Sequence, residues 1–311
     1  MFRNIILNIS KNNNRYYCSS KINSGKAVDL KFITRSPTSN AVINSSNEIK
    51  NIVLLHGLFG SGNNWNKISK LLADKTNCKI FQVDQRNHGQ SPHSDEFSYR
   101  SMSDDLDQFI NKQSIEDLCI IGHSMGGRTA MLYSLLNPTK VKKLIVVDIS
   151  PRQSTSHRHN LEFRNILLRM KSMDLSKTKK RTDANDWLLP VVEDNNVRSF
   201  LLTNLACDED GNYFWRINID ALLENIDKID SFPSDSEIKS IKNSTSPIEF
   251  TKDTLFIKGG LSNFIQNEDF PKMRQLFPNY ELNVFEGFEH WLHSDDPLKF
   301  VEVSSDFINR E

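Results

Sequence analysis

The sequence predicts an α/β protein, with a doubly wound, mostly parallel sheet that carries a helical cap insertion. Short apolar runs rich in Ile, Val, Leu and Phe recur between longer amphipathic segments. Most of these runs are continuous rather than alternating, as expected for strands buried on both faces of a parallel sheet. The alternation of strand and helix stops between about residues 152 and 250 and then resumes. This interruption predicts an insertion into a single sheet.

The individual elements follow from these patterns. Parallel strands are predicted at 51–55, 79–83, 118–121, 143–149, 254–258 and 281–285. Helices are predicted at about 63–75, 99–112, 125–136, 268–277 and 297–309. The segment VDLKFIT, residues 28–34, alternates apolar and polar side chains instead. Such alternation predicts an antiparallel strand at the edge of the sheet.

The insertion is expected to be largely helical. It contains the amphipathic segments LEFRNILLRMKSM and INIDALLENIDKI and no convincing strand pattern. An insertion at the carboxyl edge of the strands, where ligands bind to such sheets, is typical of a lid or cap. The predicted division is a core of residues 28–151 and 251–311, with the cap and its connection at 152–250. Within that connection, the Ser-, Asp- and Lys-rich run 231–252 is predicted to be a surface segment.

Composition and charge exclude several classes of protein. The 311 residues include 39 basic and 39 acidic side chains, so no overall field points to nucleic acid or to an acidic substrate. Four widely spaced cysteines form no C-x-x-C pair, which predicts neither a disulfide framework nor a metal site. No apolar run approaches the ~20 residues of a membrane span. No Gly-rich phosphate loop or cofactor motif is present in the sequence, so we expect no cofactor and no metal.

The N-terminal segment differs from the rest of the chain. Its first 28 residues hold five basic side chains and no acidic one, and they are rich in Ser and Asn. These features favour a mitochondrial transit peptide over residues 1–27, and thus a matrix protein. Arg15 followed by YYCS resembles a matrix-processing site, which predicts cleavage near Tyr17 or Cys18. The alternative is an Asn-rich tail without a targeting role.

One motif at a strand end carries the chemistry. Gly122-His123-Ser124-Met125-Gly126 fits G-x-S-x-G and lies between a predicted buried strand and a predicted helix. In a nucleophile elbow, the serine stands on a sharp strand-to-helix turn, and small residues two before and two after it let the strand and helix pass closely. The motif and its setting predict that Ser124 is a nucleophile.

Acyl transfer at Ser124 also needs hydrogen-bond donors for the tetrahedral oxyanion. One predicted donor is the backbone N–H of Met125, the residue after the nucleophile. The other is expected from the loop after the strand 51–55, which reads HGLFGS. Leu58 is the chosen donor in this loop, and Phe59 is the near alternative.

The predicted general base is His290, because it follows the final predicted strand and the chain order in such folds is Ser, then Asp or Glu, then His. The acid is less clear, since the position after the next-to-last strand that usually holds Asp is Ser262. Asp148 ends the strand after the predicted nucleophile helix, and Asp220 lies in the cap. Asp148 is favoured because a sheet terminus positions a carboxylate more rigidly than a lid.

Longer blocks of the sequence show a family resemblance. HGLFGSGNNW, DQRNHGQSPHS, GHSMGGRTAM and EHWLHSDDP resemble the α/β-hydrolase domain-containing protein 11 family. That family is similar to small bacterial esterases and to the ethanol acetyltransferases of yeasts, and the resemblance runs from about residue 28 to the C-terminus. It implies an α/β-hydrolase fold and a mitochondrial serine esterase or thioesterase with Ser124 and His290 as nucleophile and base. For the acid it implies a carboxylate at either Asp148 or Asp220.

These observations predict a cofactor-free serine hydrolase that cleaves short- to medium-chain acyl esters or thioesters through an acyl-enzyme on Ser124. The alternatives are an alcohol acyltransferase with the same triad and a catalytically weak hydrolase fold that serves as a binding partner. The cap is expected to line an apolar acyl pocket with Phe163, Leu167, Met170, Trp187, Leu188 and Phe214.

Overall fold

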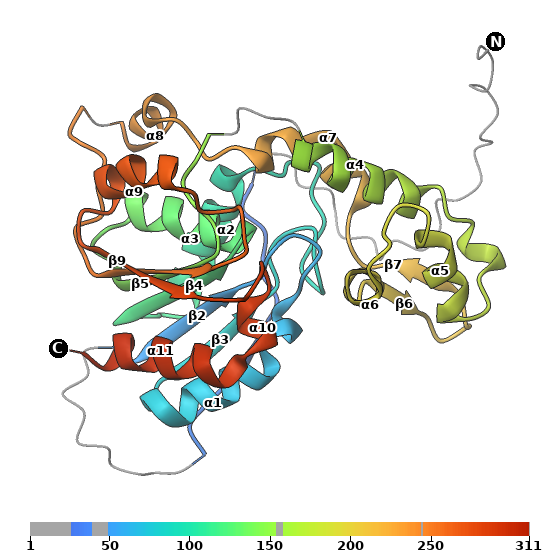
Figure 1. The fold of residues 1–311 in the computed structure, drawn as a ribbon, viewed down its shortest axis with the longest axis horizontal. Coiled ribbons are helices and arrows are strands. Elements are labelled where there is room, and N and C mark those ends of the chain that lie inside the picture. Colours follow the sequence, from blue (N-terminus) through green and yellow to red (C-terminus); the bar gives the residue numbers. More distant parts are fainter. Residues whose placement is uncertain (1–25, 39–48, 154–157, 244, 311) are drawn as a thin grey trace.

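The computed structural model describes residues 26–38, 49–153, 158–243 and 245–310, with the side chains of 158–160 not described. A seven-stranded sheet forms the centre of the molecule (Figure 1). Its strands are β1 (Phe32–Arg35), β2 (Asn51–Leu55), β3 (Lys79–Val83), β4 (Leu118–His123), β5 (Val141–Val147), β8 (Thr254–Gly259) and β9 (Tyr280–Phe285). They lie in the order β1-β3-β2-β4-β5-β8-β9. All neighbours are parallel except β1 and β3, so the predicted antiparallel edge strand is confirmed.

Helices cover both faces of this sheet. The flanking helices are η1 (Gly62–Trp65), α1 (Asn66–Thr76), α2 (Tyr99–Lys112), α3 (Met125–Leu136), η3 (Asn267–Asp269), α9 (Phe270–Leu276), α10 (Leu292–Asp295) and α11 (Pro297–Asn309). Successive side chains of a strand point to opposite faces. Ile52 and Leu54 accordingly pack in one apolar cluster with α1 and α11, while Val53 and Leu55 pack in the other with α2 and α3. Burial on both faces explains the mostly apolar sequences of β2, β3, β4, β5 and β8, whereas the edge strand β9 has only Phe285 buried.

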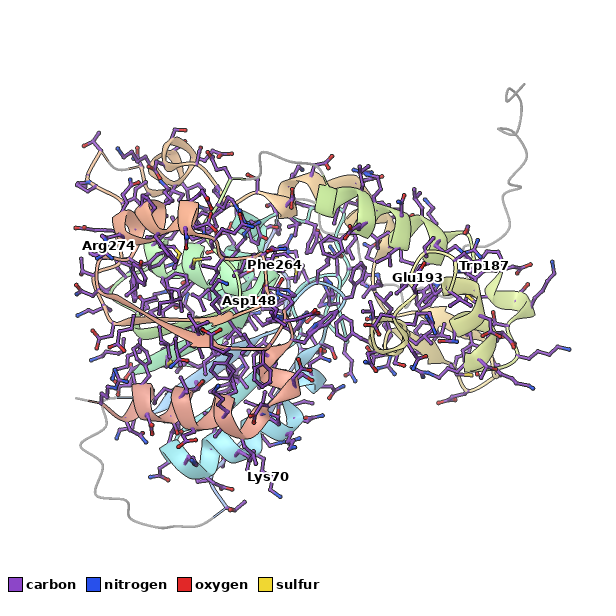
Figure 2. The ribbon with its side chains drawn as sticks, in the orientation of Figure 1. Lys70, Asp148, Trp187, Glu193, Phe264 and Arg274 are labelled. Atoms are coloured by element: carbon purple, nitrogen blue, oxygen red, sulfur yellow. The ribbon has the colours of Figure 1, made fainter. Side chains whose placement is uncertain are left out.

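Most of the insertion between β5 and β8 forms a lobe beside the sheet, whereas its last helix lies over the core near α3 and α9 (Figure 1). Its elements are α4 (Arg158–Lys171), η2 (Leu175–Lys177), α5 (Arg181–Leu188), α6 (Asn195–Leu202), β6 (Leu205–Cys207), β7 (Tyr213–Trp215), α7 (Ile219–Asp230) and α8 (Asp235–Lys242). Figure 2 shows Trp187 in this lobe, which we call the cap, and Asp148 at the sheet. The expectation of no strand in the cap was wrong, because β6 and β7 pair as a small antiparallel hairpin. Each strand has only three residues, too few for a periodic pattern to be visible in the sequence.

The run 231–252 is more than a surface connection. It contains α8, which begins at a capping box formed by Ser234 and Glu237. Phe232, Ile238 and Phe250 in this run are at most 1 % exposed and belong to the larger apolar cluster. These three apolar residues anchor a segment that is otherwise polar, and the average composition of the run conceals them.

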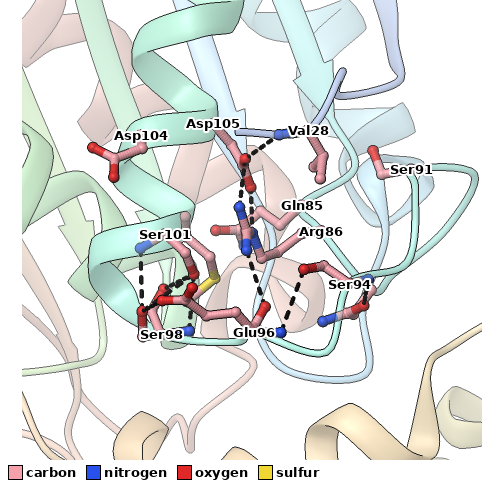
Figure 3. Close-up of polar contacts among 12 residues, drawn as sticks. Val28, Gln85, Arg86, Ser91, Ser94, Glu96, Ser98, Ser101, Asp104 and Asp105 are labelled. Carbon is pink, nitrogen blue, oxygen red and sulfur yellow. Dashed lines mark hydrogen bonds and ion pairs between the residues drawn. The ribbon is translucent and has the colours of Figure 1, made fainter. Parts of the chain in front are cut away.

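The described chain begins with a segment tied to the core by a buried ion pair. Arg86 Nε and Asp105 Oδ2 lie 2.6 Å apart, and both side chains are 1 % exposed (Figure 3). Asp105 Oδ1 also accepts the Val28 N–H at 2.6 Å, and an Arg86 Nη2–H is donated to the Lys26 carbonyl. Most of the predicted transit peptide, residues 1–25, lies outside the described residues. Within the described chain, no helix is long and apolar enough to cross a membrane.

Candidate active site

The G-x-S-x-G motif forms a strained turn between β4 and α3. Ser124 has φ 53° and ψ −118°, a conformation that costs a non-glycine residue of the order of 1–3 kcal/mol. A Cβ atom at Gly122 would lie 2.3 Å from the Gly126 carbonyl oxygen, and one at Gly126 would lie 2.4 Å from the Leu55 carbonyl oxygen. Glycine is therefore required at both positions for the strand and helix to pass this closely.

The structure brings Asp148 and His290 together. Asp148 directly follows β5, has φ 49°, is fully buried, and accepts a hydrogen bond from His290 Nδ1 at 2.8 Å. An ionised carboxylate can only accept hydrogen bonds, so the proton of the neutral imidazole is on Nδ1. His290 Nε2 is then left with a lone pair, as a general base requires.

Ser262 occupies the usual acid position and contacts the acid that replaces it. Its hydroxyl donates a short hydrogen bond to Asp148 Oδ2, while the Gly259 N–H is donated to Asp148 Oδ1 at 2.9 Å. Phe264, two residues on, stacks on the His290 ring with centroids 4.0 Å apart. Neither Ser262 nor Phe264 was predicted to support the site, because neither contact has a signature in the sequence.

The structure does not bring Asp220 to His290. Asp220 lies in the first turn of α7, its side chain is 62 % exposed, and its Oδ1 pairs with Lys171 Nζ at 2.6 Å. The candidate acid in the cap is thus a surface ion pair between α7 and α4. An amphipathic helix places such an acidic residue on its solvent face, and its sequence alone does not distinguish that from a catalytic position.

The loop after β2 lies against the serine. A Cβ atom at Gly57 would be 3.3 Å from Ser124 Cβ. Phe59, the alternative oxyanion donor, already donates its N–H to His88 Nε2 at 3.2 Å. Within the part of the chain that the structure describes, the N–H groups of Leu58 and Met125 donate no hydrogen bond. The geometry therefore favours Leu58 over Phe59 as the donor from this loop.

Ser124 and His290 line one cavity of about 130 Å³ between the core and the cap. Its core side includes Gly57, Leu58, Trp65 and Trp291. The cap contributes apolar side chains from α4 and α6, namely Phe163, Ile166, Val197, Phe200 and Leu201. This wall makes the cavity suited to an apolar chain attached to a carbonyl at Ser124.

Of the six cap residues expected to line this pocket, only Phe163 does so. Leu167, Met170 and Leu188 are fully buried inside the cap. Trp187 donates its indole N–H to the Arg169 carbonyl, and Phe214 is 36 % exposed. The apolar residues of the cap thus divide between its own small core, the cavity and the surface, and only the tertiary structure assigns each to one of them.

Buried histidines surround the site. His56, His88 and His293 are each at most 4 % exposed, and burial lowers their pKa values to about 4, about 3 and about 3. Burial also holds the pKa of His123 well below its usual range. These four imidazoles are neutral at pH 7. Among the described residues, no group of three or more His, Cys, Asp or Glu is arranged to hold a metal ion.

Comparison with known proteins identifies the fold and the family. The family model for the alpha/beta hydrolase fold matches residues 50–297. The sn-1-specific diacylglycerol lipase ABHD11 of Mus musculus is 35% identical over 296 residues, which cover 94% of this chain and 91% of the relative. Ethanol acetyltransferase 1 of Cyberlindnera jadinii is 29% identical over 83% of this chain and 79% of its own length. A solved structure titled marine microorganism esterase is 37% identical with a TM-score of 0.79, covering 90% of this chain and all of that one.

The sheet, the elbow and the Asp148–His290 pair define an alpha/beta hydrolase. The chain belongs to the α/β-hydrolase domain-containing protein 11 family within that fold. Relatives and fold together support an ester-hydrolysing enzyme.

Proposed function

We propose that this protein is a serine hydrolase that cleaves short- to medium-chain acyl esters or thioesters through an acyl-enzyme on Ser124. The observation that carries the proposal is the 2.8 Å hydrogen bond between Asp148 and His290, beside the same cavity that Ser124 lines. A base oriented by a carboxylate, beside a serine that faces a cavity, is the arrangement that activates a hydroxyl as a nucleophile.

The proposed reaction has two halves. His290 Nε2 takes the proton of Ser124 Oγ as that oxygen attacks the substrate carbonyl, and the N–H groups of Leu58 and Met125 stabilise the oxyanion. Collapse of the tetrahedral intermediate breaks the bond to the alcohol or thiol, which leaves with the proton from His290. A water molecule then attacks the acyl-enzyme with His290 as base, and the acid is released as Ser124 regains its proton.

Asp148 has the orienting role in this proposal. It fixes the tautomer of His290 and stabilises the imidazolium that forms in each half-reaction. The Gly259 N–H and the Ser262 hydroxyl donate hydrogen bonds that hold the carboxylate in place. The site can therefore do without an acid at position 262.

The proposed substrates are esters or thioesters with an apolar acyl group of modest length. The apolar wall from α4 and α6 and the small cavity support this. The mouse relative is named a lipase for diacylglycerol, which makes the acyl-chain length of the substrate the first property to measure. The yeast relative named an ethanol acetyltransferase supports a second candidate, transfer of the acyl group to an alcohol in place of water.

We also propose that the protein acts in the mitochondrial matrix. The support is the basic, acid-free segment that precedes residue 28. Fusion of residues 1–30 to a fluorescent reporter tests the location. A reporter that remains in the cytosol contradicts it.

A fluorophosphonate probe tests the acyl-enzyme. We expect it to label the wild-type protein and not Ser124→Ala, since the probe reacts with an activated serine. Esters of increasing acyl length, each assayed with and without added ethanol, then measure the length preference and the division between hydrolysis and transfer. Absence of labelling in folded wild-type protein would overturn the proposed function.

A further inference from the structure

In the loop after β2, the backbone N–H of Phe59 is bonded to the core and its backbone carbonyl is bonded to the cap. The Phe59 N–H is donated to His88 Nε2 at 3.2 Å, and the Phe59 carbonyl accepts from Asn204 Nδ2 at 2.8 Å. His88 belongs to the core loop after β3, whereas Asn204 lies in the cap between α6 and β6. All three residues are at most 3 % exposed. Their hydrogen bonds are therefore shielded from water, where an unmade bond is costly.

Phe59 needs these contacts because its backbone is strained. Its φ is 64°, in the left-handed region that a bulky side chain rarely adopts. The neighbouring Gly57 carbonyl is fixed by hydrogen bonds from His56 Nδ1 at 2.8 Å and from the Gly60 N–H at 3.0 Å. In a trans peptide the N–H points opposite to the carbonyl, so these bonds aim the Leu58 N–H. The strained Phe59 conformation closes the turn that keeps Gly60 in position to do this.

Asn204 also contacts the cavity wall. Its Nδ2 group has two hydrogens, one donated to the Phe59 carbonyl and the other to the Leu201 carbonyl at 3.1 Å. Leu201 is in α6, which contributes three side chains to the cavity. Both acceptors are carbonyls, so only the amide nitrogen can make these two bonds. A single side chain thus joins the helix that faces the acyl chain to the loop that faces the oxyanion.

We propose that Asn204 is a positioning residue for the oxyanion loop, the segment after β2 that carries the Leu58 N–H. Through Asn204, an acyl chain that packs on α6 fixes the conformation of this loop, so kcat depends on the length of the acyl chain. This inference rests on the proposed hydrolysis at Ser124 with the Leu58 N–H as a donor. An acyl chain long enough to pack on α6 orders that helix, and Asn204 then holds Phe59 and Leu58 in the productive conformation. Contact energy remote from the carbonyl is in this way used to stabilise the transition state.

The first test compares two buried cap asparagines. Asn225 in α7 donates to the core carbonyl of Asp95 at 2.9 Å and does not line the cavity, so Asn225→Ala loosens the cap without touching the oxyanion loop. We measure kcat and KM for p-nitrophenyl acetate, butyrate and hexanoate. Loss of a complete oxyanion donor costs roughly 10²–10³ in kcat, and we expect Asn204→Ala, which only loosens the loop, to lose about tenfold with hexanoate and less with acetate. Asn225→Ala keeps the wild-type dependence on chain length.

The second test measures the oxyanion hole itself. A trifluoromethyl ketone forms a tetrahedral adduct with an active-site serine, whereas the matching methyl ketone binds as a ground-state analogue. We expect Asn204→Ala to weaken inhibition by the trifluoromethyl ketone about tenfold and to change methyl ketone binding by less than about twofold. A residue that only stabilised the cap would weaken both ketones alike. Asn204→Leu removes the donors while retaining the volume, and it serves if the alanine variant does not fold.

The experiments distinguish a wrong role for Asn204 from a wrong proposed function. If wild-type protein is labelled at Ser124 and hydrolyses the esters, but Asn204→Ala and Asn225→Ala behave alike in both tests, the role of Asn204 is wrong and the proposed function stands. If folded wild-type protein neither hydrolyses the esters nor forms the adduct, the proposed function fails and this inference fails with it.

Discussion

The two carboxylates that the sequence offers as the orienting acid lie in opposite surroundings. At the carboxyl edge of the core sheet, Asp148 is fully buried and accepts hydrogen bonds from Gly259, Ser262 and His290. In the cap, Asp220 is 62 % exposed and pairs with Lys171 on the neighbouring helix. The backbone of the adjacent strand β8 fixes the carboxylate in the core, whereas the helix in the cap presents its carboxylate to solvent. The comparison teaches that the chemistry belongs to the core, and that the cap acts on it through a few defined contacts.

The largest expected effect comes from neutralising each of the two carboxylates separately. Loss of the orienting acid of a triad typically lowers kcat by ~10⁴ with the fold intact, and we expect this for Asp148→Asn. Asp220→Asn is expected to change kcat by less than about twofold, because exposed ion pairs contribute little. Steady-state kinetics with one activated ester measure both. The reverse ranking would make the cap part of the triad.

Acid should destabilise the core through its buried histidines. His56 has a pKa of about 4 when folded against 6.5 as the ordinary value, and those of His88 and His293 fall to about 3. Below pH 6.5 the unfolded chain binds protons that the folded core does not. The free energy of unfolding therefore falls as the pH falls, by up to about 1.4 kcal/mol per pH unit for each histidine, until the folded pKa is reached.

Urea unfolding between pH 7.5 and 5 checks this expectation. Stability should be level above pH 7 and fall toward pH 5. His88→Gln removes one of the titrating groups, so its slope near pH 5 should be smaller by about 1.4 kcal/mol per pH unit. An unchanged slope would mean that His88 is protonated in the folded core.

Ser262 contributes to the difference between the buried and the exposed carboxylate, because it contacts the buried one. Its hydroxyl donates to the Asp148 carboxylate, and a hydrogen bond to a charged group contributes about 1.5–3 kcal/mol. Part of this acts on the orientation of His290, so we expect Ser262→Ala to lower kcat about tenfold. Ser262→Thr keeps the hydroxyl and should retain more of the activity. Equal losses in the two variants would remove Ser262 from the network.

The smallest expected change is in kcat/KM, and it should differ between variants at two phenylalanines of the cap. Phe200 lines the cavity, whereas Phe214 is 36 % exposed on the hairpin. Phe200→Ala should lower kcat/KM for a hexanoyl ester severalfold more than for an acetyl ester, since the longer chain loses an apolar contact. Phe214→Ala should leave this ratio unchanged. A change in the ratio of hexanoyl to acetyl kcat/KM for Phe214→Ala would support the sequence-based expectation that Phe214 borders the acyl pocket.

The strands of the core, the turn at Ser124 and the position of His290 could be predicted from the sequence. Five of its parallel strands are buried on both faces and are therefore continuously apolar, and the elbow around Ser124 needs small residues at fixed spacing. The position of His290 after the last strand follows from the order of the chain. Each of these features is local, so neighbouring residues specify it without knowledge of the rest of the fold.

The contacts between distant segments became visible in the folded structure and not in the sequence. In the folded structure Asp148, and not Asp220, contacts His290, and Ser262 contacts Asp148. The Phe59 N–H bonds to His88, and the apolar cap residues divide between the cavity wall and the cap interior. The physical reason is that an apolar or acidic residue on an amphipathic helix has the same local signature whichever partner it meets. Its role is fixed by what the folded chain brings against it, and that partner can be more than a hundred residues away.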